Sequence, residues 1–376
     1  MKGERKNEKL KGKNHIFFLN FRCNNSHTSQ QVRYCSANQP KNDKCMLNVE
    51  WNGNVFFASL DKDDNNNIII NNNNTGQPVD STGASANSKW FGMGLKSGGG
   101  GPYFVYGVNE AKRFGPTKFC LHGHTSKVTC SNFHPFNDDI VATGSADCTV
   151  KLWRIPSDGL TAHLKESLLT LEGHSKRIQF TEFHPTSNNI LATASATNVN
   201  EVKVWDISTG DEVFSYDDSM HEGLIVDMEW NWDGSLLGTS AKDKYVRLWD
   251  PRSDSVASKF IAHNSLRPTK FTWLDDGKIL TTGFKGGKRE TRVWDIRNSN
   301  KQLGGMRIDT ESAPLYPLYN RGTNLIFMLA RGATSIKVFE YGPSSGEIAF
   351  CGNSTVDEQC RGMLKFSPLQ RALTKT

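Results

Sequence analysis

Four histidines are the residues of this sequence whose type and spacing first suggest chemistry. Each stands 28 to 31 residues before a tryptophan: His124 before Trp153, His174 before Trp205, His221 before Trp249 and His263 before Trp294. Histidine close to Ser, Thr and Asp can act as a general base in nucleophilic catalysis. A catalytic set serves one site, whereas these histidines recur at a similar distance from four tryptophans. The repetition therefore indicates a structural role, and we expect no catalytic residue.

No other residue set in the sequence supports an enzyme or a metal site. The eight cysteines include no Cys-x-x-Cys pair and no paired spacing with histidine, so we expect reduced thiols rather than zinc or a disulfide framework. The glycine run 98–101 lacks the lysine and the following helix that a phosphate-binding loop requires. We therefore predict a protein that is not an enzyme and has neither a cofactor nor a metal.

The tryptophans lie in a repeated segment, and this repeat predicts the fold. Its five copies end at Trp153, Trp205, Trp249, Trp294 and Phe339, as Val-Lys-Leu-Trp, Val-Lys-Val-Trp, Val-Arg-Leu-Trp, Arg-Val-Trp and Lys-Val-Phe. The steps between these aromatic positions are 52, 44, 45 and 45 residues. Such a spacing resembles that of WD40 repeats, in which four strands form each blade of a propeller. Short alternating runs separated by Gly, Asn, Asp and Ser agree with an all-β protein that contains little helix.

The resemblance to WD40 repeats implies a buried hydrogen-bond network in each blade, formed by the histidine, a Ser or Thr, an Asp in a strand turn and the tryptophan. In blade two these residues are His124, Thr143 or Ser145, Asp147 and Trp153, and in blade four they are His221, Thr239 or Ser240, Asp243 and Trp249. Blade three, with His174 and Trp205, has residues 197–200 inserted where the Asp is expected. Blade five, with His263 and Trp294, has Lys288 at that place, so we expect incomplete networks in both.

Between the repeats, an ordered series of motifs is similar to the coronin family. The motifs are Gly123-His-Thr125, Asp147 to Thr161, Leu171 to Ile178, Phe183 to Thr186, Ser240 to Arg247, Asp250-Pro-Arg252, Arg267-Pro268, Thr281 to Phe284 and Arg361-Gly-Met363. The resemblance extends over roughly residues 87–366. It implies a seven-bladed WD40 β-propeller that binds filamentous actin and organises the actin cytoskeleton. It also implies a location in the cytoplasm and at the cell cortex, and a part in cell motility.

The resemblance divides the chain into a basic, disordered extension (residues 1–30), a propeller (31–367) and a C-terminal tail (368–376). An Asn-rich insertion over residues 60–86 is expected to be a disordered loop in blade one. Coronins close the last blade with an N-terminal strand, here about Val32 to Cys35, and three C-terminal strands, of which this chain supplies about Arg361 to Phe366. We therefore expect an incomplete last blade. Because no heptad pattern follows, we expect coiled-coil oligomerisation only in a longer chain.

The charge of the chain directs the search for a contact surface to its loops. The net charge is +6, but the first 13 residues carry six Lys or Arg and two Glu, so we expect no nucleic-acid partner. A weak contact with a membrane surface is compatible with this charge. Actin has an acidic surface, which favours basic loops as contacts. The candidate residues are Lys176, Arg177, Lys242, Lys244, Lys285, Lys288 and Arg289, whereas Glu50 lies nearest the place where coronins carry a basic actin-contacting residue.

A second pattern favours a different function. Trp249-Asp-Pro-Arg252 and Trp294-Asp-Ile-Arg297 have the Trp-Asp-x-Arg form of propellers that recruit substrates to cullin-type ubiquitin ligases. The alternative hypothesis is therefore a non-cytoskeletal scaffold of that kind.

Overall fold

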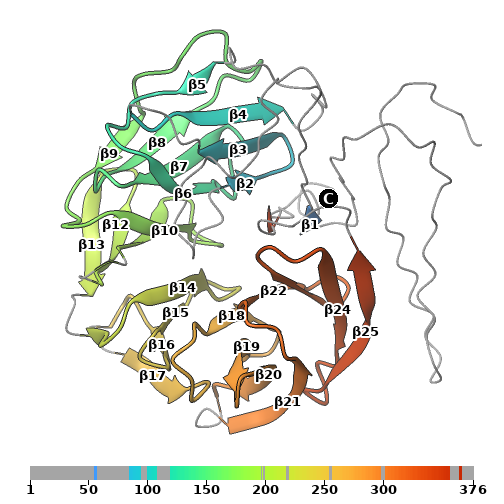
Figure 1. The fold of residues 1–376 in the computed structure, drawn as a ribbon. Coiled ribbons are helices and arrows are strands. Elements are labelled where there is room, and N and C mark those ends of the chain that lie inside the picture. Colours follow the sequence, from blue (N-terminus) through green and yellow to red (C-terminus); the bar gives the residue numbers. More distant parts are fainter. Residues whose placement is uncertain are drawn as a thin grey trace, which may run out of the picture.

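The computed structural model describes residues 55–56, 84–94, 100–107, 119–195, 197, 200–216, 220–253, 256–297, 301–355 and 364–365. All regular elements in these residues are strands, and they form a ring of antiparallel sheets (Figure 1). In this part of the chain, no helix has the length and apolar character that crossing a membrane would require. The predicted all-β propeller is confirmed.

Six sheets of four strands follow one another along the chain, and we number them as blades one to six. Blade one contains β2 (Ala84–Ala86), β3 (Trp90–Gly94), β4 (Tyr103–Gly107) and β5 (Cys120–Leu121). Blade two contains β6 (Val128–Phe133), β7 (Ile140–Ser145), β8 (Val150–Arg154) and β9 (Leu169–Leu171). Blade three contains β10 (Ile178–Phe183), β11 (Ile190–Ser195), β12 (Val202–Asp206) and β13 (Asp211–Tyr216).

Blades four to six repeat this arrangement in the second half of the chain. Blade four contains β14 (Ile225–Trp230), β15 (Leu237–Ala241), β16 (Tyr245–Trp249) and β17 (Val256–Ile261). Blade five contains β18 (Lys270–Trp273), β19 (Lys278–Lys285), β20 (Lys288–Asp295) and β21 (Lys301–Asp309). Blade six contains β22 (Leu315–Asn320), β23 (Leu325–Ala330), β24 (Ser335–Tyr341) and β25 (Ile348–Thr355).

The two ends of the described chain meet in a seventh, two-stranded sheet. There β1 (Val55–Phe56) pairs antiparallel with β26 (Leu364–Lys365), and β26 contacts β2 of blade one. This pairing lies between blade one and blade six in Figure 1, at the place where a seventh blade would close the ring. The strand predicted near Val32 to Cys35 lies outside the described residues, and the partner of β26 among them is Val55–Phe56.

The Asn-rich insertion was expected to be a loop as far as residue 86, but its last three residues form a strand. Residues 84–86 form β2, which pairs with β3 and is the first strand of blade one. Ser85 Oγ lies 2.9 Å from Tyr103 Oη and 3.0 Å from Ser131 Oγ, so this strand is tied both to its own blade and to the next one. Blade one has its four strands within residues 84–121. The remainder of residues 60–83, the extension 1–30, Glu50 and the tail 368–376 lie outside the described residues.

The hydrophobic core is divided among the interfaces between neighbouring blades. One cluster joins Ala192 and Val204 of blade three to Met228 and Leu237 of blade four, and comparable clusters lie between the other described neighbours. The second strand of a blade is covered on both faces, which explains why β23 reads Leu-Ile-Phe-Met-Leu-Ala and is buried throughout. Outer strands such as β13 face solvent and are largely polar. The blades therefore form a rigid support for their connecting loops.

Two kinds of loop meet at one end of each blade. We call the segment that precedes the first strand of a blade its leading loop, and the turn between its second and third strands its middle hairpin. In blade two the N–H of Ala146 in the middle hairpin donates to Lys127 O in the leading loop at 2.9 Å, and Lys242 and Leu224 make the same contact in blade four. The first strands of neighbouring blades contact each other start to start, as in Thr129 Oγ1 to Ile178 O, and end to end, as in Trp230 Nε1 to Glu182 O. These first strands therefore run in the same direction. The leading loops and middle hairpins consequently lie on one side of the propeller, which we call the leading-loop face.

Candidate functional site

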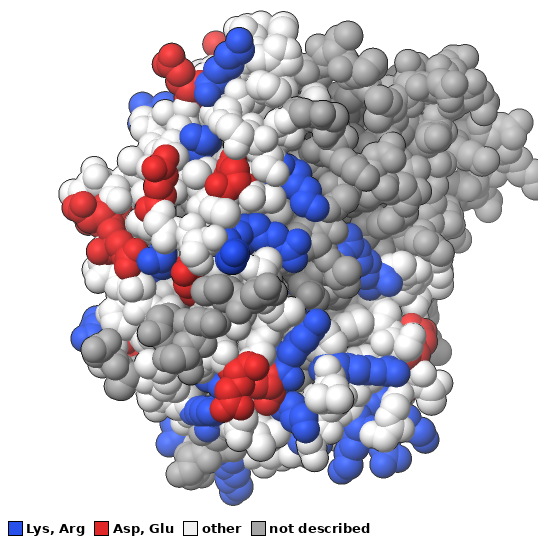
Figure 2. Space-filling view, turned by 60° about the vertical axis from the view of Figure 1, so that its left-hand side comes forward, with Lys and Arg blue, Asp and Glu red and all other residues white. Residues whose placement is uncertain are grey.

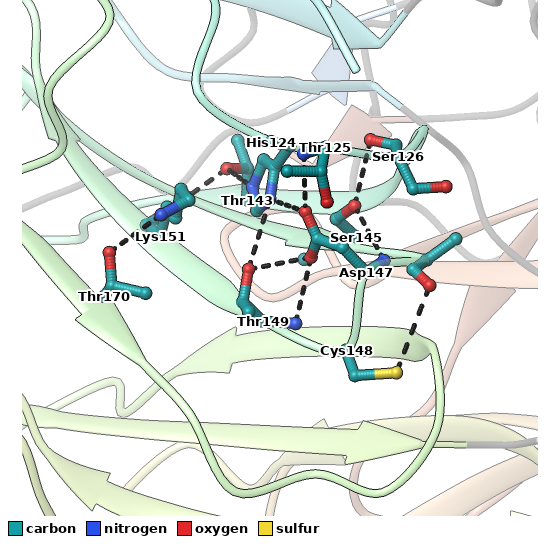
Figure 3. A network of polar contacts seen from close by, with 12 residues as sticks. His124, Thr125, Ser126, Thr143, Ser145, Asp147, Cys148, Thr149, Lys151 and Thr170 are labelled. Atoms are coloured by element: carbon teal, nitrogen blue, oxygen red, sulfur yellow. Dashed lines mark hydrogen bonds and ion pairs between the residues drawn. The ribbon is translucent and has the colours of Figure 1, made fainter. Parts of the chain in front are cut away.

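The histidine of blade two lies in a continuous chain of hydrogen bonds beneath the leading-loop face (Figure 3). Trp153 Nε1 donates to Thr143 Oγ1 at 2.8 Å, Thr143 Oγ1 lies 2.9 Å from His124 Nε2, and His124 Nδ1 lies 2.9 Å from Asp147 Oδ2. Asp147 also accepts from the N–H groups of Thr125 and Thr149. Because His124, Thr143 and Trp153 are buried and each is hydrogen-bonded within this network, the network fixes the leading loop against the middle hairpin. The burial of His124 and Thr143 agrees with a structural role.

Blades three and five correct the expectation of incomplete networks. In blade three, His174 Nδ1 lies 3.3 Å from Glu201 Oε2, and in blade five His263 Nδ1 lies 2.9 Å from Glu290 Oε1. Each glutamate stands four residues before the tryptophan, whereas Asp147 and Asp243 stand six residues before theirs. The additional methylene of glutamate lets a residue at or beside the third strand reach the histidine. That position, four residues before Trp, is the sequence signal that would have identified both glutamates.

In blade four the expected acidic residue is present, but it binds a different partner. Asp243 Oδ2 lies 2.6 Å from a terminal guanidinium nitrogen of Arg247, which is buried. His221 Nε2 still lies 3.0 Å from Thr239 Oγ1, but its Nδ1 has no hydrogen-bond partner among the described residues. The arginine occurs because this ending reads Val-Arg-Leu-Trp, and its long side chain reaches the middle hairpin. The expected contact between His221 and Asp243 is replaced by an ion pair.

Burial keeps three of these histidines uncharged near neutral pH. Desolvation lowers the pKa of His174 and of His263 from 6.5 to about 4, against the opposing effects of Glu201 and Glu290. Desolvation together with the Arg247 charge lowers the pKa of His221 to about 3. Burial by itself would raise the pKa of Asp147. The hydrogen bond and charge of His124, together with the hydrogen bonds from Thr149, outweigh burial and hold this pKa well below its usual range. Near neutral pH the imidazoles of His174, His221 and His263 are therefore uncharged.

The exposed candidate cations all lie on the leading-loop face. Lys176 is exposed and Arg177 half-buried in the leading loop of blade three, while Lys242 and Lys244 lie in the middle hairpin of blade four. Lys285 and Lys288 are exposed at the middle hairpin of blade five. Lys244 Nζ donates to Asn264 Oδ1 in the leading loop of blade five at 2.9 Å, so the loops of blades four and five touch. The structure thus brings four of the predicted lysines to adjacent blades and places Lys176 and Arg177 one blade further along the ring.

The hairpin that carries Lys285 and Lys288 is tight. The strands β19 and β20 pair as far as Lys285 with Lys288, leaving only Gly286 and Gly287 between them. Both glycines have a positive φ, of 57° and 77°, which is the requirement of a two-residue hairpin turn and strains other residues. The two lysines are therefore held next to each other at the tip of a regular hairpin.

Arg289, the last of the candidates, is not available for a surface contact. Its side chain is 1% exposed and makes ion pairs with Asp309 and, at 2.8 Å, with Glu311. It also donates to Ala313 O at 3.1 Å, in the leading loop of blade six. Lys288 is the first residue of β20 and is exposed, whereas the side chain of Arg289 lies on the opposite face of the strand and is buried. An actin contact through Arg289 would require this group to leave its ion pairs, so we do not include it in the candidate contact surface.

Comparisons with known proteins agree with this architecture. Residues 115–154 match the family model of the WD domain, G-beta repeat, and residues 186–276 match that of the anaphase-promoting complex subunit 4 WD40 domain. The crystal structure of the WD40 domain from Toxoplasma gondii coronin superposes with a TM-score of 0.69 at 28% sequence identity, covering 75% of this chain and 73% of that chain. The chain is a coronin-like WD40 propeller. A structure of the mitotic checkpoint complex also matches, with a TM-score of 0.59, 13% identity and coverage of 76% and 84%, and this likeness concerns the fold alone.

The two faces of the coronin-like propeller differ in their charged residues. Loops on the face opposite the leading loops contain many aspartates, namely Asp138, Asp139, Asp206, Asp233, Asp250, Asp275 and Asp295. In the side view of Figure 2, several Lys and Arg side chains gather at the lower right, and Asp and Glu side chains lie at the left edge and in a group at the bottom centre. WD40 propellers are typically non-enzymatic scaffolds for protein–protein contacts. The basic face is accordingly the candidate contact surface for an acidic partner.

The Trp-Asp-x-Arg arginines of the coronin-like propeller lie on the aspartate-rich face. Arg252 Nε lies 2.9 Å from Asp250 Oδ1, and its side chain is 75% exposed. Arg297 is 62% exposed and lies 3.6 Å from Asp295 Oδ1. Each arginine is thus turned toward the aspartate of its own motif. Recruitment to a ubiquitin ligase through these arginines stays a prediction.

Proposed function

We propose that this chain binds filamentous actin through its leading-loop face and helps to organise actin filaments at the cell cortex. The observation that carries this proposal is the coronin-like propeller whose exposed candidate lysines share one face. The family resemblance supplies the partner, and the charge of the face fits it, because filamentous actin is acidic. The opposite face, with its many aspartates, is less suited to such a partner.

The energetics require several lysines to act together. One exposed ion pair contributes under about 1 kcal/mol, since water and salt screen it and two long side chains must be ordered. Lys242, Lys285 and Lys288 are all exposed, and Lys244 is linked to the loop of the next blade, so the cations of blades four and five can meet one acidic surface together. Binding should therefore weaken with salt, because the Debye length shrinks from about 14 Å at 50 mM to about 4 Å at 500 mM.

Reversing the charge of the blade-five hairpin is expected to weaken binding to actin filaments by about tenfold. The test is the double variant Lys285→Glu, Lys288→Glu, measured by co-sedimentation with filamentous actin at increasing filament concentration. Both side chains are exposed, so the melting temperature should stay within about 1 °C of that of the unmodified chain. Arg289 stays unchanged in this design because it is buried.

The matched control is Arg297→Glu, Lys301→Glu, which changes the net charge by the same amount on the opposite side of blade five. Both of these residues are exposed. Filament binding should be reduced much less in this control than in the hairpin variant. Equal losses in the two variants would mean that overall charge, rather than the leading-loop face, governs binding. Absence of pelleting by the unmodified chain would overturn the proposed function itself.

A further inference from the structure

An apolar side chain projects from the leading loop of blade five, in the middle of the basic surface. Leu266 is 81% exposed, more than any other large hydrophobic side chain among the described residues. Most other exposed large apolar residues lie on or beside outer strands, namely Phe119, Leu168, Val213, Ile261, Leu303 and Phe350. Met220, which is 41% exposed, lies in the leading loop of blade four. A single exposed leucine is ordinary in proteins, but Leu266 is the more exposed of these two leading-loop residues and has cations close to it in sequence and in space.

The loop that presents Leu266 is anchored on both sides of it. On one side His263 is fully buried, with Nε2 2.9 Å from Thr281 Oγ1 and Nδ1 2.9 Å from Glu290 Oε1. The N–H of Ser265 donates to His263 O at 2.9 Å, and that of Arg267 donates to Ser265 Oγ at 3.2 Å. On the other side Pro268 restricts the backbone before β18 begins. An anchored loop loses little conformational entropy on binding, which favours a contact through its tip.

Cations contact the loop that carries this leucine and its neighbouring segments. Arg267 lies with its guanidinium carbon 4.5 Å from the centre of the Phe284 ring and donates to Ser312 O at 3.4 Å, so its charge is held beside Leu266. Lys244 reaches Asn264 of the same loop, and Lys285 directly follows Phe284 at the hairpin. An apolar centre with a charged rim is the arrangement found at the energetic centres of protein interfaces.

We propose that Leu266 is the apolar anchor of the leading-loop face and inserts into an apolar recess that acidic side chains surround on the partner protein. This inference rests on the proposed function and names the actin filament as that partner. The lysines and Arg267 would orient the two surfaces through charge, whereas Leu266 would hold them together by excluding water. The two contributions differ in their response to salt, since screening weakens charge pairs and leaves apolar burial almost unaffected.

The test compares Leu266→Ala with the matched control Val213→Ala, an exposed apolar residue on the outer strand β13. In co-sedimentation with actin filaments, Leu266→Ala is expected to raise the half-saturating filament concentration at least about tenfold, which corresponds to the loss of an interface hot spot. Val213→Ala should bind like the unmodified chain. Because both side chains are exposed, neither substitution should change the melting temperature appreciably.

Salt separates this inference from the proposed function. The factor lost in Leu266→Ala should be the same at about 100 mM and about 250 mM salt, whereas the factor lost in Lys285→Glu, Lys288→Glu should shrink as salt rises. Binding of Leu266→Ala equal to that of Val213→Ala would overturn the anchor and leave the proposed function standing. If the unmodified chain does not bind filaments at all, the proposed function and the inference built on it are both wrong.

Discussion

Lowering the pH from 7.5 to 5 is expected to remove roughly 2 kcal/mol of folding free energy for each of three buried histidines. In the folded chain the pKa of His174 and of His263 is about 4 and that of His221 about 3, against 6.5 in the unfolded chain. Between these values the unfolded chain binds more protons than the folded one, so stability is fully present above about pH 6.5 and decreases as the pH falls. The combined loss is a large part of the stability of a typical domain.

Chemical denaturation at pH 7.5 and pH 5 measures this effect directly. The variant His263→Gln removes one of the titrating groups, so the difference between its unfolding free energies at the two pH values should shrink by about a third. His122→Asn, at an exposed position, is the control and should retain the full difference. An unfolding free energy that is the same at both pH values would contradict the buried, neutral histidine networks.

Replacing Arg289 by methionine is expected to destabilise the fold by about 3 to 5 kcal/mol, because it removes one partner of a buried ion-pair group. The substitution would leave the partly buried Asp309 with Lys337, at 3.2 Å, as its remaining cation, and would leave Ala313 O without its arginine donor. Burial raises the pKa of Asp309, but the hydrogen bonds and charge of Arg289 outweigh it, so this carboxylate is ionised and needs its cation. Thermal and chemical denaturation measure the loss.

Lys288→Met is the matched control for this substitution, because it removes the neighbouring positive charge at an exposed position of the same hairpin. Its effect on unfolding free energy should stay within about 0.5 kcal/mol. In actin co-sedimentation the order reverses: Lys288→Met should weaken binding, and Arg289→Met should leave the binding of its folded fraction unchanged. Equal stability of the two variants would mean that the Arg289 ion pairs contribute nothing to the fold.

The repeated features of the chain could be predicted because they are local in sequence. Each blade is one copy of the repeat, which shows in the spacing of about 45 residues, the endings with Lys or Arg two residues before Trp, and the turn residues between short strands. Every blade packs against its neighbours in the same way, so the same residue types recur. The resemblance to WD40 repeats implied the position of His124 near Asp147 and near Thr143 or Ser145. The family resemblance added the ring of blades, the partner and the basic loops to be searched.

Other features depended on contacts between segments that are distant in sequence. Strand register decides whether Glu201 and Glu290 reach their histidines. The closure of the ring decides which strand pairs with β26. Sequence alone treats Lys288 and Arg289 as equivalent cations, but alternation along β20 sends the first to solvent and the second to Asp309. The sequence by itself determined the blades, because a blade is built from neighbouring residues. Only the tertiary structure decided which charges and which leucine are exposed, because exposure depends on how separate blades and loops pack against one another.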